Sequence, residues 1–253
     1  KKAPKEEKKP QNKPLTFPGK HGITPLRNCL WKDRHSGSLL AAAWDGALLG
    51  RERSTVKIPE DYLERVYAGW LGKVIGIRLG AAVEGWTYEK IRQVFGELWD
   101  YPAEYKNFSA DDDSNGPLFF VRALEDCGDV EAFSSQDVAE ALLNYAPFEH
   151  GFFWWGGYGV STEHTAYLNL RNGIPAPRSG SIQQNGSTMA EQIGGQIFID
   201  PWGLVSPGNP KQAAQLAEKA ASVTHGGNGV WGGVYVACAI SLAFVEPDLE
   251  KVL

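Results

Sequence analysis

The sequence predicts an all-α fold, a compact multi-helix bundle, and three observations support this. Apolar residues recur at spacings of three, four and seven from Pro59 onward, helix-capping residues precede several of these stretches, and no stretch alternates convincingly with a period of two. Hydrophobic residues make up 43% of the 253 positions and charged residues 22%. A chain of this size and composition can bury one sizeable core.

The chain divides into three predicted parts. Residues 1–14 are rich in Lys, Glu and Pro and lack aromatic and β-branched residues, so we expect a disordered tail. Residues 15–55 form an N-terminal extension of uncertain structure, in which only 39–49 is helix-like. Residues 56–253 are predicted to form the helical domain.

The charge distribution limits the partners of the protein. The tail has a balance of +4, so the remaining chain carries -9 against a total of -5. A body this acidic is a poor candidate for a nucleic-acid groove, because phosphate contacts need clustered Lys and Arg. The three cysteines, Cys29, Cys127 and Cys238, show no metal or disulfide spacing and predict buried or free thiols. They neither support nor exclude secretion. We expect a soluble protein. The sequence does not determine its cellular compartment, and the cytoplasm is slightly favoured.

The first helix is expected to begin near Pro59, which suits a first-turn position. Its apolar positions have the spacing of one buried face: Tyr62, Leu63, Val66, Trp70, Val74 and Ile77. A second stripe consists of glycines: Gly69, Gly72, Gly76 and Gly80. Each glycine weakens a helix by up to ~1 kcal/mol relative to alanine. We therefore expect another backbone or a ligand to approach this stripe closely, with helix packing favoured for Gly69 and Gly72.

Capping signals predict the later helices. One opens at Gly116-Pro117 and runs to about Cys127; one is capped by Ser134 or Ser135 and runs to Tyr145; one is capped by Ser161 and ends at Gly173; and one starts at Asn209-Pro210 and ends near Thr224. The apolar segment Val230–Val245 has sixteen residues, fewer than the ~20 that cross a bilayer. It predicts a core helix rather than a membrane span.

Three consecutive aspartates, Asp111, Asp112 and Asp113, precede the helix that runs to Cys127. Adjacent like charges repel one another, whereas a hard divalent cation prefers oxygen ligands and offsets that repulsion. The triplet therefore indicates a Mg²⁺ or Ca²⁺ site. The alternative is a solvated acidic turn in which Asp113 or Ser114 caps the helix.

Five elements follow one another in a distinctive order. They are Ala68-Gly69-Trp70-Leu71-Gly72 continuing to Val83-Glu84-Gly85-Trp86, Asp111-Asp112-Asp113-Ser114, Gly157-Tyr158-Gly159 with Ser161-Thr162, Asn185-Gly186-Ser187-Thr188-Met189, and Thr224-His225. In order and spacing, across roughly residues 62–245, they resemble the ADP-ribosylglycohydrolase family. The resemblance implies an all-α fold that holds two Mg²⁺ ions in the complete protein, with Mn²⁺ as an alternative.

The resemblance also implies an activity and a set of site residues. The activity is hydrolysis of the glycosidic bond between ADP-ribose, or a related nucleotide ribose, and an acceptor on a protein or small molecule, through an oxocarbenium-like transition state. The metal ligands would be Asp111, Asp112 and Asp113, and the catalytic groups Glu84, Asp112 and Asp113. The substrate-binding residues would be Gly157, Tyr158, Gly159, Ser161, Thr162, Asn185, Gly186, Ser187 and His225.

The residues themselves leave several of these roles open. Glycine turns before a helix expose backbone N–H groups that suit a pyrophosphate, or they form an ordinary loop. Trp154, Trp155 and Tyr158 either offer flat faces for stacking or pack as core aromatics, and the core role is favoured for Trp154. His225 either donates to substrate or caps backbone carbonyls. Glu84 is either the acid/base or gating carboxylate, or a surface loop residue.

Departures from the family pattern are also present. Asp111 and Ser114 stand where the family has threonine, and Ala190-Glu191 stands where it commonly has an arginine, so anion recognition there is expected to differ. The chain ends at Leu253 before a second acidic metal element, and we expect a longer natural protein. Two alternatives to the metal-dependent enzyme remain: a non-catalytic structural or nucleotide-binding relative, and a metal-free glycosidase that pairs Glu84 with an aspartate.

Overall fold

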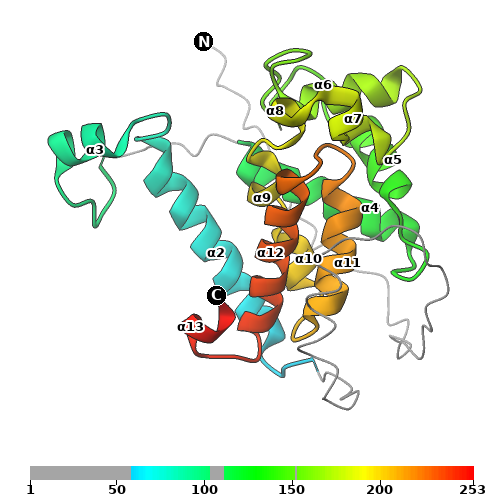
Figure 1. Ribbon diagram of the computed structural model, residues 1–253. Coiled ribbons are helices and arrows are strands. Elements are labelled where there is room, and N and C mark those ends of the chain that lie inside the picture. Colours follow the sequence, from blue (N-terminus) through cyan, green and yellow to red (C-terminus); the bar gives the residue numbers. More distant parts are fainter. Residues whose placement is uncertain (1–57, 103–110, 152) are drawn as a thin grey trace, which may run out of the picture. The chain divides into compact units, whose positions relative to one another are not determined.

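Residues 58–102, 111–151 and 153–253 are described by the computed structural model (Figure 1). The predictions for residues 1–14 and 15–55, including the helix-like stretch 39–49 and Cys29, lie outside these ranges. Within them every regular element is helical, which confirms the predicted all-α fold. No helix in these ranges is both long enough and apolar enough to span a membrane.

The described residues form the following helices in chain order. They are α2 (Tyr62–Ala81), α3 (Tyr88–Phe95), α4 (Asp112–Cys127), α5 (Ser135–Tyr145), α6 (Thr162–Arg171), η1 (Arg178–Gly180), α7 (Ile182–Asn185), α8 (Ser187–Ala190), α9 (Gly194–Ile197), α10 (Asp200–Leu204), α11 (Pro210–Ala221), α12 (Asn228–Ala243) and α13 (Leu249–Val252).

The core lies where α4, α5, α10, α11 and α12 meet. Helix α12 packs against α9, α10 and α11, and α4 packs against α5 and α10, as their neighbouring ribbons show (Figure 1). Aromatic side chains fill the centre: the ring centroid of Trp202 lies 5.6 Å from that of Phe120 and 5.1 Å from that of Phe133. These rings are fully buried, so they anchor α4 and fix where its first turn lies.

Glycines allow α9 and α12 to approach closely. A Cβ at Gly195 would overlap the carbonyl oxygen of Gly229, and a Cβ at Gly233 would overlap the carbonyl oxygen of Gly195. Both helices therefore require glycine at the contact. The expectation that Val230–Val245 forms a core helix holds for the face that carries Gly233, Ala237 and Cys238, whereas Trp231 and Tyr235 face outward.

Helix α2 differs from the prediction of one buried face. None of its residues is buried, and Leu63, for example, is 76% exposed. Side-chain hydrogen bonds tie the helix to the core instead: the Tyr62 hydroxyl donates to the carbonyl of Leu204 (2.8 Å), and Lys73 pairs with Asp200. Among the described residues, the glycine stripe also lacks the expected close neighbour. A Cβ at Gly72, Gly76 or Gly80 would meet no atom within 4 Å, and one at Gly69 only a Leu204 methyl at 3.6 Å.

The predicted start of α4 is wrong by one turn. The helix begins at Asp112 rather than at Gly116-Pro117, and Asp111 rather than Asp113 or Ser114 is its N-cap. The reason is a capping box, in which Asp111 accepts from the Ser114 N–H and the Ser114 hydroxyl accepts from the Asp111 N–H. The hydrogen bonds of this capping box start the helix before Pro117, so Pro117 lies inside the helix and not at its first turn.

The predicted starts of α5, α6 and α11 agree with the structure. Ser134 and Ser161 cap α5 and α6, and Asn209 caps α11 through the Gln212 N–H. Helix α11 ends at Ala221, three residues before the expected Thr224, because a turn leads into His225. Cys127 and Cys238 are free thiols.

Candidate functional site

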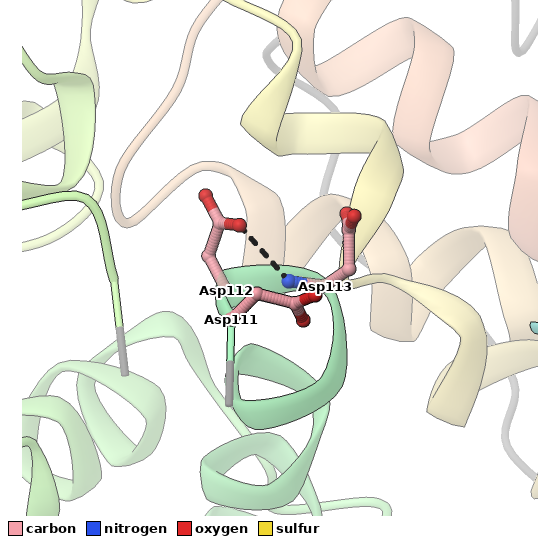
Figure 2. Close-up of side chains that lie close together, drawn as sticks. All are labelled: Asp111, Asp112 and Asp113. Carbon is pink, nitrogen blue, oxygen red and sulfur yellow. Dashed lines mark hydrogen bonds between the residues drawn. The ribbon is translucent and has the colours of Figure 1, made fainter. Parts of the chain in front are cut away.

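The start of α4 carries the acidic corner, which we define as Asp111, Asp112 and Asp113. One carboxylate oxygen from each residue lies within 4.8 Å of those from the other two. Figure 2 shows Asp112 and Asp113 rising from the first helical turn while Asp111 lies across it, with the Asp113 N–H donating to Asp112 at 3.1 Å. The predicted metal ligands are therefore brought together at one helix end.

The acidic corner is electrostatically strained when no cation is bound. Partial burial, followed by the neighbouring carboxylates, raises the pKa of Asp112 above its usual value. Partial burial and the charge of Asp112 raise the pKa of Asp113 to about 6, although Lys73 opposes this rise. A divalent cation would supply the missing positive charge, so the donor set fits a hard metal ion.

Two predicted catalytic carboxylates are electrostatic neighbours. Glu84 lies in the turn after α2, where the Val83 N–H donates to the Gly80 carbonyl, and it is exposed. Its charge contributes to the raised pKa of Asp112. The charge of Glu84 therefore acts on the acidic corner.

A partly buried charge pair acts on the same corner. Lys73 of α2 pairs with Asp200, the first residue of α10, and both side chains are largely shielded from solvent. The charges of both residues act on the pKa of Asp113. Because they are 127 positions apart, no local sequence pattern reveals this pair.

Glu163 is a further carboxylate of the site, which sequence reasoning missed. It is only 5% exposed, burial raises its pKa to about 7, and the charge of Asp112 adds to this rise. Its Oε1 lies 3.6 Å from Nε2 of His225. An acidic residue at a helix start is common because it suits the helix dipole, so the sequence alone gave no reason to single it out.

His225 is buried rather than open to a substrate. Its ring is 1% exposed, and burial lowers its pKa to about 3, so the imidazole is neutral near pH 7. Nδ1 lies 2.7 Å from the Thr224 hydroxyl, while Nε2 has no hydrogen-bond partner among the described residues. The contact between His225 and Glu163 is therefore not an ion pair at neutral pH.

The glycine turn before α6 is held by side chains of that helix. The Gly157 N–H donates to Nδ1 of His164 (3.0 Å), and the Gly159 N–H donates to the Thr165 hydroxyl (2.9 Å). Ser161 and Thr162 are fully buried, and Thr162 donates to the Met189 carbonyl (2.6 Å). These two N–H groups and two hydroxyls are thus already engaged within the protein.

Which aromatic residues near this turn are exposed and which are packed differs from the prediction. Trp154, interpreted as a core residue, is 56% exposed. Trp155 packs instead among Phe148, Phe153 and Tyr167. The Tyr158 ring is exposed, and its hydroxyl contacts the Asn169 side chain at 3.4 Å. Among the described residues, Trp154 and Tyr158 are therefore the accessible flat surfaces at this turn.

Asn169 connects the glycine turn with the Asn-Gly-Ser element. Its amide donates to the Asn185 side chain (2.8 Å) and to the Ser179 carbonyl (2.9 Å). Gly186 and Ser187, which follow Asn185 in the sequence, are exposed at the start of α8. The structure therefore links two predicted substrate elements through one buried amide that the sequence did not single out.

Glu191 occupies the place where the family resemblance suggested an arginine. Its Oε1 accepts the Asn228 N–H (2.8 Å) at the start of α12. Gly227, the residue before Asn228, has φ +51°. A Cβ at Gly227 would overlap the Glu191 carboxylate. The helix start that could attract an anion is thus already satisfied by a carboxylate of the chain.

The site combines three clustered carboxylates, which suit a divalent cation, with a buried pair of a carboxyl group and an imidazole. The family model described as ADP-ribosylglycohydrolase matches residues 58–253, and the chain belongs to this family. The chain is also 29% identical over 190 residues to an uncharacterized protein from Archaeoglobus fulgidus, covering 72% of this chain and 58% of that protein. The chain thus spans less than two thirds of this relative. No solved structure matches significantly.

Proposed function

We propose that this protein is a metal-dependent hydrolase that cleaves the glycosidic bond between ADP-ribose, or a related nucleotide ribose, and an acceptor. The observation that carries the proposal is the acidic corner, whose three carboxylates lie within 4.8 Å of one another. Membership of the ADP-ribosylglycohydrolase family supports the reaction class. The substrate would be an ADP-ribosylated protein or a small-molecule adduct.

Each carboxylate has a proposed part. Asp111, Asp112 and Asp113 would hold Mg²⁺ or Mn²⁺ through their free oxygens, while one oxygen of Asp111 continues to cap α4. A bound divalent cation would supply Lewis acidity and lower the pKa of a water molecule toward neutrality. Glu84, which is exposed beside this corner, would exchange a proton with the leaving group or the attacking water.

The substrate elements divide into accessible and supporting residues. Tyr158, Gly186 and Ser187 are exposed, so we assign them to substrate contact. Ser161, Thr162 and His225 are buried, and we assign them to holding the loops that carry those contacts. Gly157, Gly159 and Asn185 would shape the same surface through their internal hydrogen bonds.

The test is Mg²⁺-dependent release of ADP-ribose from an ADP-ribosylated protein and from a small-molecule adduct, with the complete gene product. We expect release in Mg²⁺, loss in EDTA, and a fall of at least a hundredfold in the Asp112→Asn, Asp113→Asn double variant. Equal rates for this variant and the wild type would remove the catalytic role of the acidic corner.

The same assay separates the two alternative functions. A non-catalytic nucleotide-binding relative would bind ADP-ribose without releasing it from any adduct. A metal-free glycosidase would retain its activity in EDTA and lose it in Glu84→Gln. Each outcome differs from that of the metal-dependent enzyme.

A further inference from the structure

The glycine turn at residues 157–159 is held by helix α6 at each of its three positions. The backbone N–H groups of Gly157 and Gly159 bond to side chains in the first turn of α6. The Tyr158 hydroxyl reaches further along the helix and donates to Oδ1 of Asn169 at 3.4 Å. Asn169 thus contacts the residue of this turn that carries a side chain.

The amide nitrogen of Asn169 faces two oxygen atoms and bonds to both. Nδ2 donates to Oδ1 of Asn185 at 2.8 Å and to the carbonyl of Ser179 at 2.9 Å. An amide nitrogen carries two hydrogens, so its donor capacity is fully used here. Asn169 is only 2% exposed, which shields these bonds from water. The Asn169 side chain is therefore fixed in one orientation.

Asn185 is tied to the same point by a second hydrogen bond, because its own amide donates to the Ser179 carbonyl at 2.8 Å. Asn185 is the last residue of α7, and Gly186 follows it with φ +80°, a conformation that favours glycine. Ser187 then opens α8 and is exposed. Fixing the Asn185 side chain therefore fixes the point at which the exposed Gly186–Ser187 turn begins.

The acceptor of both amides, Ser179, belongs to a closely packed part of the molecule. Ser179 is fully buried, and its hydroxyl donates to the Val223 carbonyl at 2.6 Å. A Cβ at the next residue, Gly180, would overlap the backbone of Thr224. The hydrogen-bond network thus has a firm base in η1, and Asn169 joins that base to the glycine turn.

We propose that Asn169 is a positioning residue for the substrate: without touching it, Asn169 holds Tyr158 and the Gly186–Ser187 turn in a fixed relation, so that both present one preformed surface to the ADP-ribosyl group. This inference rests on the proposed function, because it takes these exposed residues as substrate contacts. Groups that are ordered in the free protein need no further ordering on binding, which raises affinity.

The test is ADP-ribose binding to the complete gene product in Mg²⁺, measured by isothermal titration calorimetry. Asn169→Leu replaces the amide by an apolar side chain of similar size. It should raise the Kd for ADP-ribose at least about tenfold, because both substrate segments must then be ordered on binding. The control is Ser241→Ala, which removes a buried hydrogen bond to the Ser206 carbonyl near the end of α12. It should lower the melting temperature and leave the Kd for ADP-ribose unchanged.

Mn²⁺ binding distinguishes positioning from general damage to the fold. The electron paramagnetic resonance signal of free Mn²⁺ gives the Kd at the proposed cation site, and this Kd should be the same in Asn169→Leu and the wild type. A parallel loss of affinity for ADP-ribose and for Mn²⁺ would refute the positioning role. A wild type that binds no Mn²⁺ would count against the proposed metal dependence and leave the ADP-ribose comparison as the test of Asn169.

The outcomes also separate this inference from the proposed function. If the wild type releases ADP-ribose from an adduct and Asn169→Leu binds ADP-ribose equally tightly, the positioning role is refuted and the proposed function stands. If the wild type binds ADP-ribose but releases none, the hydrolase is refuted, while a tenfold difference in Kd still supports the positioning role. If the wild type binds no ADP-ribose, the substrate contacts are refuted, and this inference with them.

A second variant keeps the inference testable if Asn169→Leu fails to fold. Asn169→Asp has almost the same volume and keeps an oxygen toward Tyr158, but a carboxyl group, charged or neutral, cannot supply both hydrogen bonds of the amide. We expect a several-fold higher Kd for ADP-ribose in this variant. An unchanged Kd refutes the positioning role.

Discussion

At the scale of single residues, burial determines the behaviour of the site more than residue type does. Glu163 and His225 are both titratable, yet burial favours the neutral form of each: the pKa of Glu163 is raised to about 7 and that of His225 is lowered to about 3. Their effects on stability oppose each other. As the pH falls from about 6.5 toward 3, the unfolded histidine gains a proton that the folded one resists, which destabilises the fold.

Glu163 has the opposite dependence, and one variant isolates it. Its raised pKa means that the folded protein holds this proton up to about pH 7, so stability is lost as the pH rises from about 4.5 to 7. In EDTA, Glu163→Gln should be more stable than the wild type by on the order of 2–3 kcal/mol at pH 8 and by almost nothing at pH 4. Urea unfolding at both pH values measures this difference. A difference that does not change with pH would contradict the assignment, because His225 and Asp112 are common to both proteins.

At the scale of elements, the helix ends were predictable where capping is local, as at Ser134, Ser161 and Asn209. The start of α4 was predicted one turn late. Proline favours the first turn of a helix, so Pro117 indicated a later start, and the Asp111–Ser114 sequence is compatible with an acidic turn as well as with a capping box. The acidic corner was visible as a triplet of adjacent carboxylates. Its neighbours Lys73, Asp200 and Glu163 were not, since tertiary packing alone brings them together.

The contact between α9 and α12 gives a prediction at the same scale. In Gly195→Ala the new methyl group would overlap the backbone carbonyl of Gly229, and backbone cannot yield without moving a helix. We expect a loss of about 2–4 kcal/mol in the free energy of unfolding. The matched control is Gly232→Ala on α12, whose methyl group would overlap the Gln196 side chain rather than backbone, so this variant should lose less. Guanidinium unfolding compares the two variants, and equal losses would show that the close approach is not rigid.

At the scale of the whole molecule, cation binding at one helix start should be visible in global stability. A ligand that binds only the folded state at 100 times its Kd adds about 2.7 kcal/mol. For a domain of this size that corresponds to a rise in melting temperature of roughly 5–10 °C. We expect this rise with Mg²⁺ in the complete gene product and its reversal by EDTA, followed by differential scanning calorimetry.

The double variant Asp112→Asn, Asp113→Asn supplies the comparison for this measurement. Removing two repelling carboxylates should raise the melting temperature of the metal-free protein, because the pKa values of both groups are elevated there. The response to Mg²⁺ should disappear. An unaltered response would place the stabilising cation elsewhere in the molecule.

Glu191 has a practical consequence for chemical probes of this protein. Because its carboxylate already neutralises the start of α12, a probe that presents a phosphate or sulfate there would be repelled by a like charge. A compound with an ammonium or amidinium group at that end would meet a ready counter-ion. A cationic tail at that end of a compound is therefore expected to bind more favourably than an anionic one.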